Sequence, residues 1–235
     1  MTTTRLTAVE LRKATDTRAG FWLQLSTAGI TLAAVAILLM IDKSDNALQD
    51  VLALAVQPAG VLLPIVGILL VTSEWSQRTA LITFTLVPER LPVLTAKVVA
   101  SVLIALAATV AAVAVSMFGT ALAGGEMTLS AAILGQVVVY TVTAMLTGVA
   151  LGALLQSSAP AIVASFAAPL AIAALASIPQ LKGALIWIDQ ARTLGPLTDD
   201  TLSATEWAHA ATTLVAWLAI PLAIGAWRLA RGEIR

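Results

Sequence analysis

Six long stretches of this sequence are apolar and almost free of charge, and they limit the possible folds more than any other feature. Crossing about 30 Å of hydrocarbon takes roughly 20 apolar residues in a helix, and every stretch reaches about that length. None contains Asp, Glu or Lys, and Arg228 near the end of the last one is their single Lys or Arg. The stretches are residues 21–41, 51–71, 98–123, 130–155, 159–178 and 207–229.

These stretches predict transmembrane helices rather than a barrel. Strands of a membrane barrel run for about ten residues and alternate apolar with polar side chains, whereas these stretches are continuously apolar and about twice as long. The first exceeds the apolar core of a signal peptide, about 7–15 residues, so we expect it to be retained. We therefore expect an all-α membrane protein, with a cytoplasmic amphipathic lead-in over residues 1–20 and one six-helix transmembrane domain over residues 21–235.

The basic residues predict the orientation of the chain, because Lys and Arg accumulate on the cytoplasmic side of a membrane protein. With six spans both termini lie on one side, and that side carries ten of the thirteen Lys and Arg residues. The other side carries Lys43, Lys182 and Arg192. The distribution predicts cytoplasmic N- and C-termini.

Several kinds of chemistry are absent from the sequence. There is no cysteine and a single histidine, His209, which excludes thiol chemistry and a histidine metal cluster within one chain. No Gly-Lys pair occurs, so the chain has no phosphate-binding loop of the usual type. The net charge of zero gives no general attraction to nucleic acid. We expect a chain that is not an enzyme and binds no cofactor of its own.

The predicted spans also lack an ionisable residue in their interior, which an ion-coupled transporter usually needs. Their buried polar groups are neutral, and the amides are Gln24, Gln57 and Gln136. Each amide has two readings, a hydrogen bond between helices or a position lining a pathway. A position lining a pathway has more support for Gln57 than for the other two amides, because Pro58 follows Gln57 and proline loosens a helix. Broken helices often line the binding sites of transporters.

The connection between the second and third spans has a pattern of its own. Glu74 and Arg78 are spaced to pair on a helix, Thr79 can cap a short helix over residues 80–87, and Pro88 would end it. One side of this short helix is apolar, with Leu81, Phe84 and Val87 or Pro88 at helical spacing. By itself, this pattern also fits a plain connector anchored at the lipid headgroups.

The order of residues in this connection resembles the permeases of type-2 ATP-binding-cassette (ABC) exporters. The shared pattern is Glu-aromatic-x-x-Arg-Thr, an apolar helix, Pro-x-Arg and then Ala-Lys, and its positions are Glu74, Trp75, Arg78, Thr79, Pro88, Arg90, Ala96 and Lys97. Trp75 departs from the usual smaller aromatic residue, and Leu91-Pro92 stands where many members have Arg-Gly. The motif covers residues 73–97, while the layout of spans agrees along the whole chain.

The resemblance implies a function for the connection. In that family it forms a coupling helix held in a cleft of a separate ATPase subunit, which binds ATP and magnesium. It would assign ATPase coupling to Glu74, Arg78, Thr79, Leu81, Phe84, Pro88, Arg90 and Lys97. It also implies export, a second permease copy or a paralogue, and a bacterial cytoplasmic (inner) membrane. The uncharged spans favour a hydrophobic or amphipathic substrate, such as a drug, lipid or peptide. The alternatives are a secondary transporter or facilitator, and a membrane accessory subunit.

The resemblance also implies an elbow helix before the first span and short re-entrant helices before the last. The residues give partial support to each. Thr7 and Glu10 have the spacing of a capping box, which predicts a helix starting near residue 7. In the external segment 179–206, Leu181, Leu185 and Ile188 share one helical face.

Overall fold

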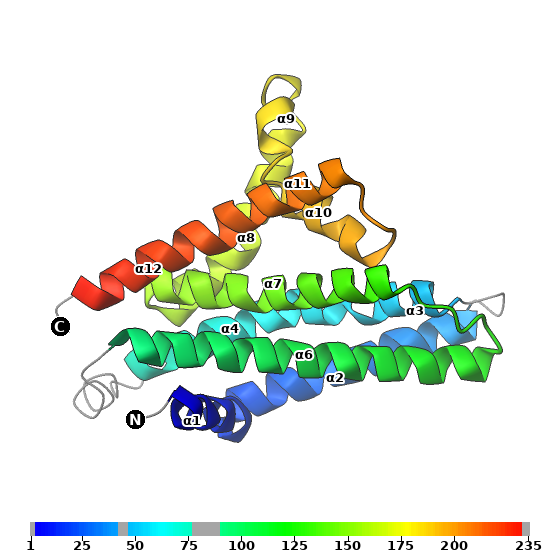
Figure 1. Cartoon of the computed structure of the whole chain (residues 1–235), viewed down its shortest axis with the longest axis horizontal. Helices are drawn as coiled ribbons and strands as arrows, with labels where there is room; N and C mark the ends of the chain where they lie inside the picture. Colours follow the sequence, from blue (N-terminus) through cyan, green and yellow to red (C-terminus); the bar gives the residue numbers. More distant parts are fainter. Residues whose placement is uncertain (1–2, 42–46, 77–89, 232–235) are drawn as a thin grey trace.

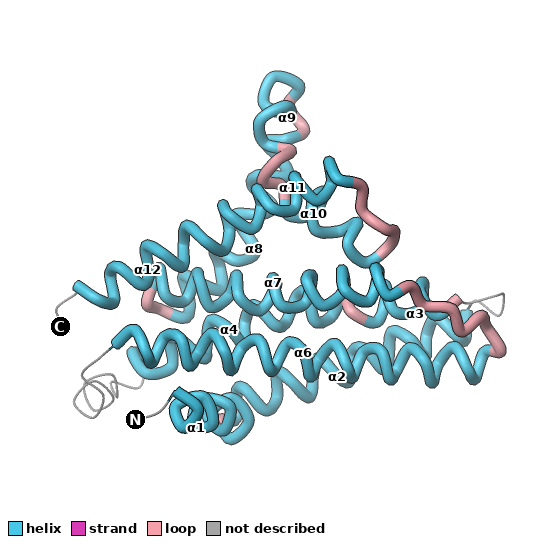
Figure 2. Tube along the Cα trace, viewed as in Figure 1, coloured by secondary structure: helices cyan, strands magenta, loops and turns pink. Residues whose placement is uncertain are grey.

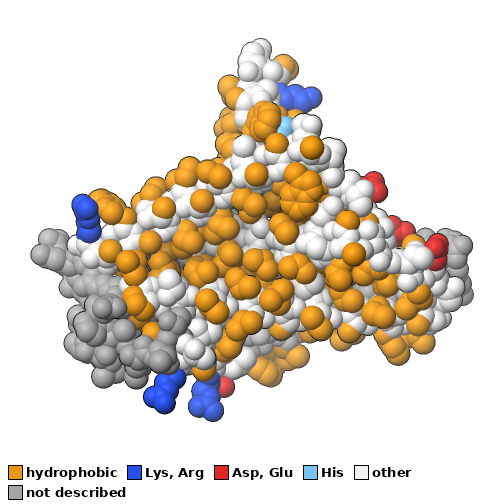
Figure 3. All heavy atoms as spheres, viewed as in Figure 1, with side chains coloured by type: hydrophobic (Ala, Val, Ile, Leu, Met, Phe, Trp, Pro, Cys, Tyr) orange, Lys and Arg blue, Asp and Glu red, His pale blue; other side chains and the backbone are white. Residues whose placement is uncertain are grey.

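The computed structural model describes residues 3–41, 47–76 and 90–231, and these residues form helices and connections without a strand (Figure 2). Six helical segments are long and apolar enough to cross a membrane, which confirms the predicted number. The segments are Arg18–Ile41, Leu48–Ser73, Leu91–Ala123, Ala131–Leu155, Ser158–Ala176 and Ala204–Arg231. Hydrophobic side chains cover the middle of the molecule, while most of the charged ones lie near its ends and on the projecting arm (Figure 3).

Four long helices run side by side and form the body of the molecule (Figure 1). They are α2 (Arg18–Ile41), α4 (Gln57–Ser76), α6 (Arg90–Ala123) and α7 (Ala131–Leu155). The spans that contain α7 and α4 are the most enclosed, with 61% and 56% of their most apolar windows buried, against 17% for α2. Helices α4 and α7 therefore form the centre, and α2 lies at the periphery.

Glycines allow α4 and α7 to approach each other closely. Gly148 and Gly152 are four residues apart on α7, the spacing of a membrane helix-packing motif. A side chain at Gly148 would collide with the Pro64 carbonyl of α4, and one at Gly67 would collide with the Met145 carbonyl of α7. The two backbones are thus in direct contact, which accounts for the burial of this pair.

Two spans depart from a regular α-helix. The second is divided at Val56 into α3 (Leu48–Ala55) and α4. Beside this break, the Thr31 hydroxyl donates to the Ala55 carbonyl at 3.0 Å. The last consists of α11 (Ala204–Leu214), a π-helical turn η2 (Val215–Ala219) and α12 (Ile220–Arg231). Turns of this kind are frequent at functional sites and hinges.

The N-terminal helix α1 (Thr3–Asp16) crosses the long helices at the end where α2 and α6 begin, and it is seen nearly end-on in Figure 1. The predicted capping box is wrong, because α1 begins at Thr3 and both Thr7 and Glu10 lie inside it. Glu10 instead turns toward α6 and pairs with Lys97, a tertiary partner that a local pattern cannot reveal.

After α7 the chain leaves the body and returns to it. Helix α8 (Ser158–Ala176) leads to α9 (Pro179–Leu185), which projects away from the long helices (Figure 1). The chain then returns through α10 (Gln190–Leu194) and the 3₁₀ turn η1 (Gly195–Thr198) to α11. The segment between the fifth and last spans therefore has short helices as expected. Only 11% of the apolar window of α8 is buried.

Candidate functional site

A cavity of about 480 Å³ lies between α4, α7, α8 and α10. Helix α4 contributes Gln57 and Pro64, and α7 contributes Tyr140. Prolines inside both facing helices, Pro64 in α4 and Pro169 in α8, line it as well. The cavity thus forms where two proline-containing spans face each other, beneath the short helix α10.

The described lining of this cavity is mostly apolar and carries no charged side chain. Its polar groups are neutral and come from all four helices: Gln57, Tyr140, Thr147, Ser165 and Gln190. The Tyr140 ring is held against Gly60, where any larger residue would meet its hydroxyl. Such a lining suits an uncharged, amphipathic molecule, because apolar walls dominate and a few polar groups orient the ligand.

Of the predicted pathway residues, Gln57 lies in this lining, while Pro58 is buried outside it. The Gln57 amide donates to the Ala53 carbonyl across the helix break at 3.1 Å, and its side chain is exposed toward the cavity side of α4. Gln57 therefore lies in the cavity lining, and its hydrogen bond to Ala53 is local to the second span and does not join two spans.

Gln136 has a different position. Gln136 is 4% exposed and bonds the segment after α10: the amide nitrogen donates to Asp200 O at 2.7 Å and to Leu197 O at 3.3 Å. The amide oxygen accepts from Leu202 N at 3.0 Å. Gln136 therefore joins the segment after α10 to the first half of α7, which is the hydrogen-bonding reading and not the lining of this cavity.

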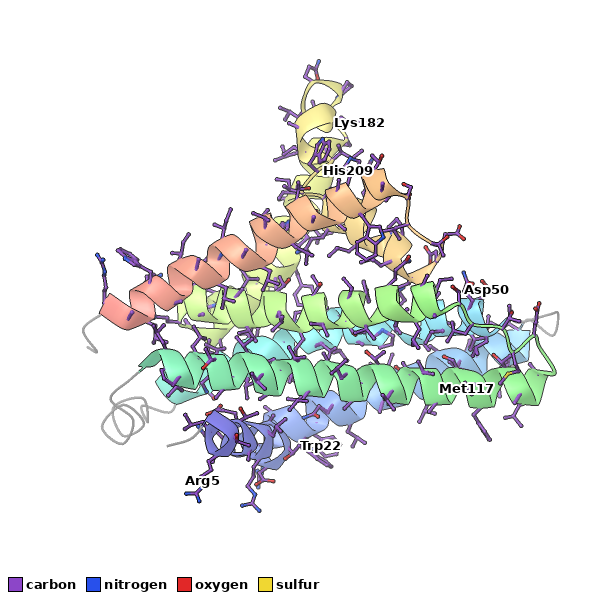
Figure 4. All side chains as sticks on the ribbon, viewed as in Figure 1. Arg5, Trp22, Asp50, Met117, Lys182 and His209 are labelled. Atoms are coloured by element: carbon purple, nitrogen blue, oxygen red, sulfur yellow. The ribbon has the colours of Figure 1, made fainter. Side chains whose placement is uncertain are left out.

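The last span is also bonded to the segment 187–202, here called the cap, which contains α10 of the cavity lining. The Trp217 indole of the π-helical turn donates to Ile188 O at 2.7 Å, and Thr213 donates to Trp187 O at 3.0 Å. The Trp187 ring meets His209 edge-on, with 4.2 Å between the ring centroids. Figure 4 labels His209 and Lys182 in the projecting part of the molecule. The π-helical turn is thus bonded directly to Ile188, two residues before Gln190 of the cavity lining.

Gln24 ties the first span to the N-terminal helix. Its amide nitrogen donates to Ala14 O at 2.9 Å and to Gly20 O at 3.3 Å. Gln24 thus makes the hydrogen bonds between helices, and it also lines a second, smaller hollow between α2 and α6.

A buried ionic cluster joins α1 to the end of α4 and the start of α6. The Lys97 ammonium lies 2.7 Å from one Glu10 oxygen and 2.9 Å from Leu70 O, and Lys13 lies 2.9 Å from the other Glu10 oxygen. The Lys97 and Glu10 side chains are 3% and 5% exposed. Because α6 begins at Arg90, Lys97 falls inside the third span, contrary to the prediction that this span carries no lysine.

The other predicted coupling residues are only partly covered by the structure. Helix α4 includes Glu74 and α6 begins at Arg90, but their side chains lie outside what is described. The remaining positions lie outside the described residues altogether: Arg78, Thr79, Leu81, Phe84 and Pro88. Of the whole set, the structure positions only the Lys97 side chain, and it is buried against Glu10.

Sequence reasoning missed most of the cavity lining. Tyr140 and Ser165 lie in uncharged spans like many other residues, and the cavity depends on how four helices meet. One signal was available, because Tyr140 is the only tyrosine in the chain and lies within a predicted span.

No protein-family model matches this chain, and a search of curated proteins gives no match. The class of protein therefore follows from the fold alone: the six apolar helices make the chain a multi-pass membrane protein.

Proposed function

We propose that this chain is the permease subunit of an ATP-driven exporter of the type-2 ABC kind. Two copies, or this chain and a paralogue, would form the pathway in a bacterial cytoplasmic membrane, with both termini in the cytoplasm. The observation that carries the proposal is the largely apolar cavity between α4 and α8, which lies beneath an external cap and has neutral polar groups. An uncharged, amphipathic substrate fits this lining.

The energy would come from a separate ATPase, because the sequence has no phosphate-binding loop. The connection between α4 and α6 would dock on that ATPase through Arg78, Thr79 and the segment 80–87. Lys97 would then have a positioning role, since it is buried at the start of α6 and bonded to Leu70 near the end of α4. This chain itself would catalyse no reaction.

The first experiment is purification of the tagged chain from its native membrane and identification of the proteins that accompany it. We expect a P-loop ATPase in about equal amount, lost in Arg78→Ala and Phe84→Ala variants. Arg12→Ala is the matched control, because Arg12 is an exposed basic residue of α1. Recovery of the intact chain without any ATPase, under conditions that preserve membrane complexes, would refute the exporter proposal.

Substrate movement is tested in proteoliposomes that contain the chain and its ATPase. We expect Gly60→Leu, which forces a side chain into Tyr140 beside the cavity, to reduce ATP-dependent transport of amphipathic dyes. Gly29→Leu is the control, because a side chain there meets nothing within 4 Å. Equal transport by the two variants would show that the cavity is not part of the transport pathway.

A second candidate function is ion-coupled transport, favoured by one observation. The buried Glu10–Lys97 pair brings ionisable groups to the start of the third span, where Lys97 lies, and proton-coupled transporters use buried ionisable residues of this kind. A pH gradient across proteoliposomes that lack any ATPase would then drive uptake or efflux, and Glu10→Gln would abolish it. ATP-dependent transport that ignores the pH gradient would eliminate this alternative.

A further inference from the structure

A groove of about 230 Å³ runs between α2 and α6, apart from the cavity under the external cap. Its floor includes Ala59 and Leu63 of α4, which are 2% and 1% exposed. Exposed residues of α2 and α6 form its rim: Ala28, Leu32, Ala107 and Ala111. Three of these four rim side chains are alanine methyl groups, so the groove is open along the side of the molecule between α2 and α6.

The groove offers water few hydrogen-bond partners. Its polar side chains already bond within the protein: Thr27 donates to Leu23 O at 2.8 Å, and Thr31 donates to Ala55 O at 3.0 Å. The Gln24 amide donates to Ala14 O and Gly20 O. A buried water needs two to four polar partners, and cavities that lack them take apolar ligands instead.

The position of the rim indicates which apolar ligand is available. Leu32 of α2 and Ala107 and Ala111 of α6 lie in the middle of membrane-spanning helices, and Leu32 is 54% exposed. The groove therefore opens onto the hydrocarbon layer, where lipid acyl chains are the surrounding medium. An acyl chain can enter along the groove without leaving that medium.

Charge at one end of the groove indicates which lipid is preferred. Gln24 marks that end, and Arg18 precedes it by six residues of the same helix, about 9 Å along the axis. Arg18 is exposed. The acidic residues of this corner have basic partners, because Glu10 bonds Lys97 and Lys13 and Asp16 lies 3.8 Å from Arg12. An exposed arginine at this corner suits a phosphate, to which it can donate two parallel hydrogen bonds.

We propose that the groove between α2 and α6 binds one acyl chain of an anionic phospholipid, whose phosphate is bound by Arg18 at the α1–α2 corner. The site does not depend on the export function, since it uses neither the cavity beneath the cap nor an ATPase. It assigns a ligand to a surface that the translocation pathway leaves unused.

The acyl-chain contact is tested by native mass spectrometry of the purified chain titrated with phosphatidylglycerol. We expect one retained lipid, and Ala111→Phe should weaken its binding at least about tenfold, the effect of excluding about two methylene groups. Val110→Phe is the matched control, because Val110 neighbours Ala111 on α6 but is 69% exposed outside the groove. Equal binding by the two variants would overturn the proposal, provided both elute as the folded protein.

The headgroup contact is tested by comparing Arg18→Gln with Arg5→Gln, which makes the same charge change at the far end of α1. Figure 4 shows Arg5 pointing away from the long helices. We expect Arg18→Gln to weaken phosphatidylglycerol binding while leaving the weaker phosphatidylcholine binding unchanged, and Arg5→Gln to change neither. If both variants lose phosphatidylglycerol binding equally, the effect comes from the general surface charge, and the assignment of Arg18 is overturned.

The identity of the occupant is tested with a phosphatidylglycerol that carries a photoreactive diazirine on its acyl chain. We expect labelled peptides from α2 and α6 that include Leu32 and Ala111, with labelling reduced in Ala111→Phe. Labelling confined to α8 would place the lipid elsewhere and refute the proposal. A crosslinker placed at Leu32 that joins two protein chains would show that a second copy covers the groove, which would also refute it.

Discussion

Replacing Lys97 with methionine should destabilise the protein by about 3 kcal/mol, at the low end of the 3–5 kcal/mol typical for breaking a buried ion pair. The Lys97 ammonium lies 2.7 Å from Glu10 and 2.9 Å from the Leu70 carbonyl, so the substitution leaves both acceptors without this donor. Methionine is similarly long and unbranched, so little packing is lost and the effect is mainly electrostatic.

The expected loss lies at the low end of the range for buried ion pairs because Lys13 also neutralises Glu10. Its ammonium lies 2.9 Å from the other Glu10 oxygen, and its side chain is 37% exposed, so part of the carboxylate charge stays compensated. The double variant Glu10→Leu/Lys97→Met removes both buried charges and should recover most of the lost stability, because apolar replacement of a buried pair is often neutral or better. The difference between single and double variants gives the coupling energy.

The assay is the free energy of unfolding of the purified protein in detergent micelles, followed by tryptophan fluorescence. Arg12→Met is the control, since Arg12 and Asp16 also pair on α1 but their side chains are 84% and 68% exposed. Such exposed pairs contribute about 0–1 kcal/mol. If Lys97→Met costs no more than Arg12→Met, the pair is not buried, and α1 is not docked on α6 as described.

Three further variants test the helix packing and the cap. Gly148→Ala should destabilise the protein by about 1–3 kcal/mol in a thermal-shift assay, because the added methyl group meets the α4 backbone. Gly135→Ala is its control and should be neutral or stabilising in that assay, because a side chain at Gly135 enters open space. Gln136→Leu should cost about 1–3 kcal/mol and accelerate hydrogen exchange over residues 197–202, which lose their bonds to its amide. Trp217→Phe should accelerate exchange near Ile188, its bonding partner; unchanged exchange in either variant would contradict the assigned role.

The number of spans could be predicted from the sequence because it depends only on the length and apolarity of each stretch. The beginning of the third span could not. Lys97 looked like the end of a cytoplasmic connection, yet α6 starts at Arg90 and carries Lys97 inside the protein. A lysine can be buried there only because Glu10, far away in the sequence, supplies the opposite charge. The same tertiary contact explains why the predicted capping box at Glu10 was wrong.

The polar residues of the spans could be recognised from the sequence, but their roles could not be separated. Gln24 and Gln136 bond neighbouring segments, while Gln57 lies in the cavity lining, and these outcomes depend on which helices meet. The close packing of α4 and α7 did leave a signal, the spacing of Gly148 and Gly152. The coupling helix over residues 80–87 stays a prediction, because it lies outside the described residues.

The direct backbone contact between α4 and α7 divides the cavity into two walls with different mechanical roles. Helices joined through glycines cannot shift past one another without steric collision, so Gln57 and Tyr140 sit on a wall of fixed shape. The opposite wall belongs to α8, which is barely enclosed and contains Pro169. We expect the fixed wall to determine which molecule is recognised, and the displacement of α8 to determine when that molecule can leave.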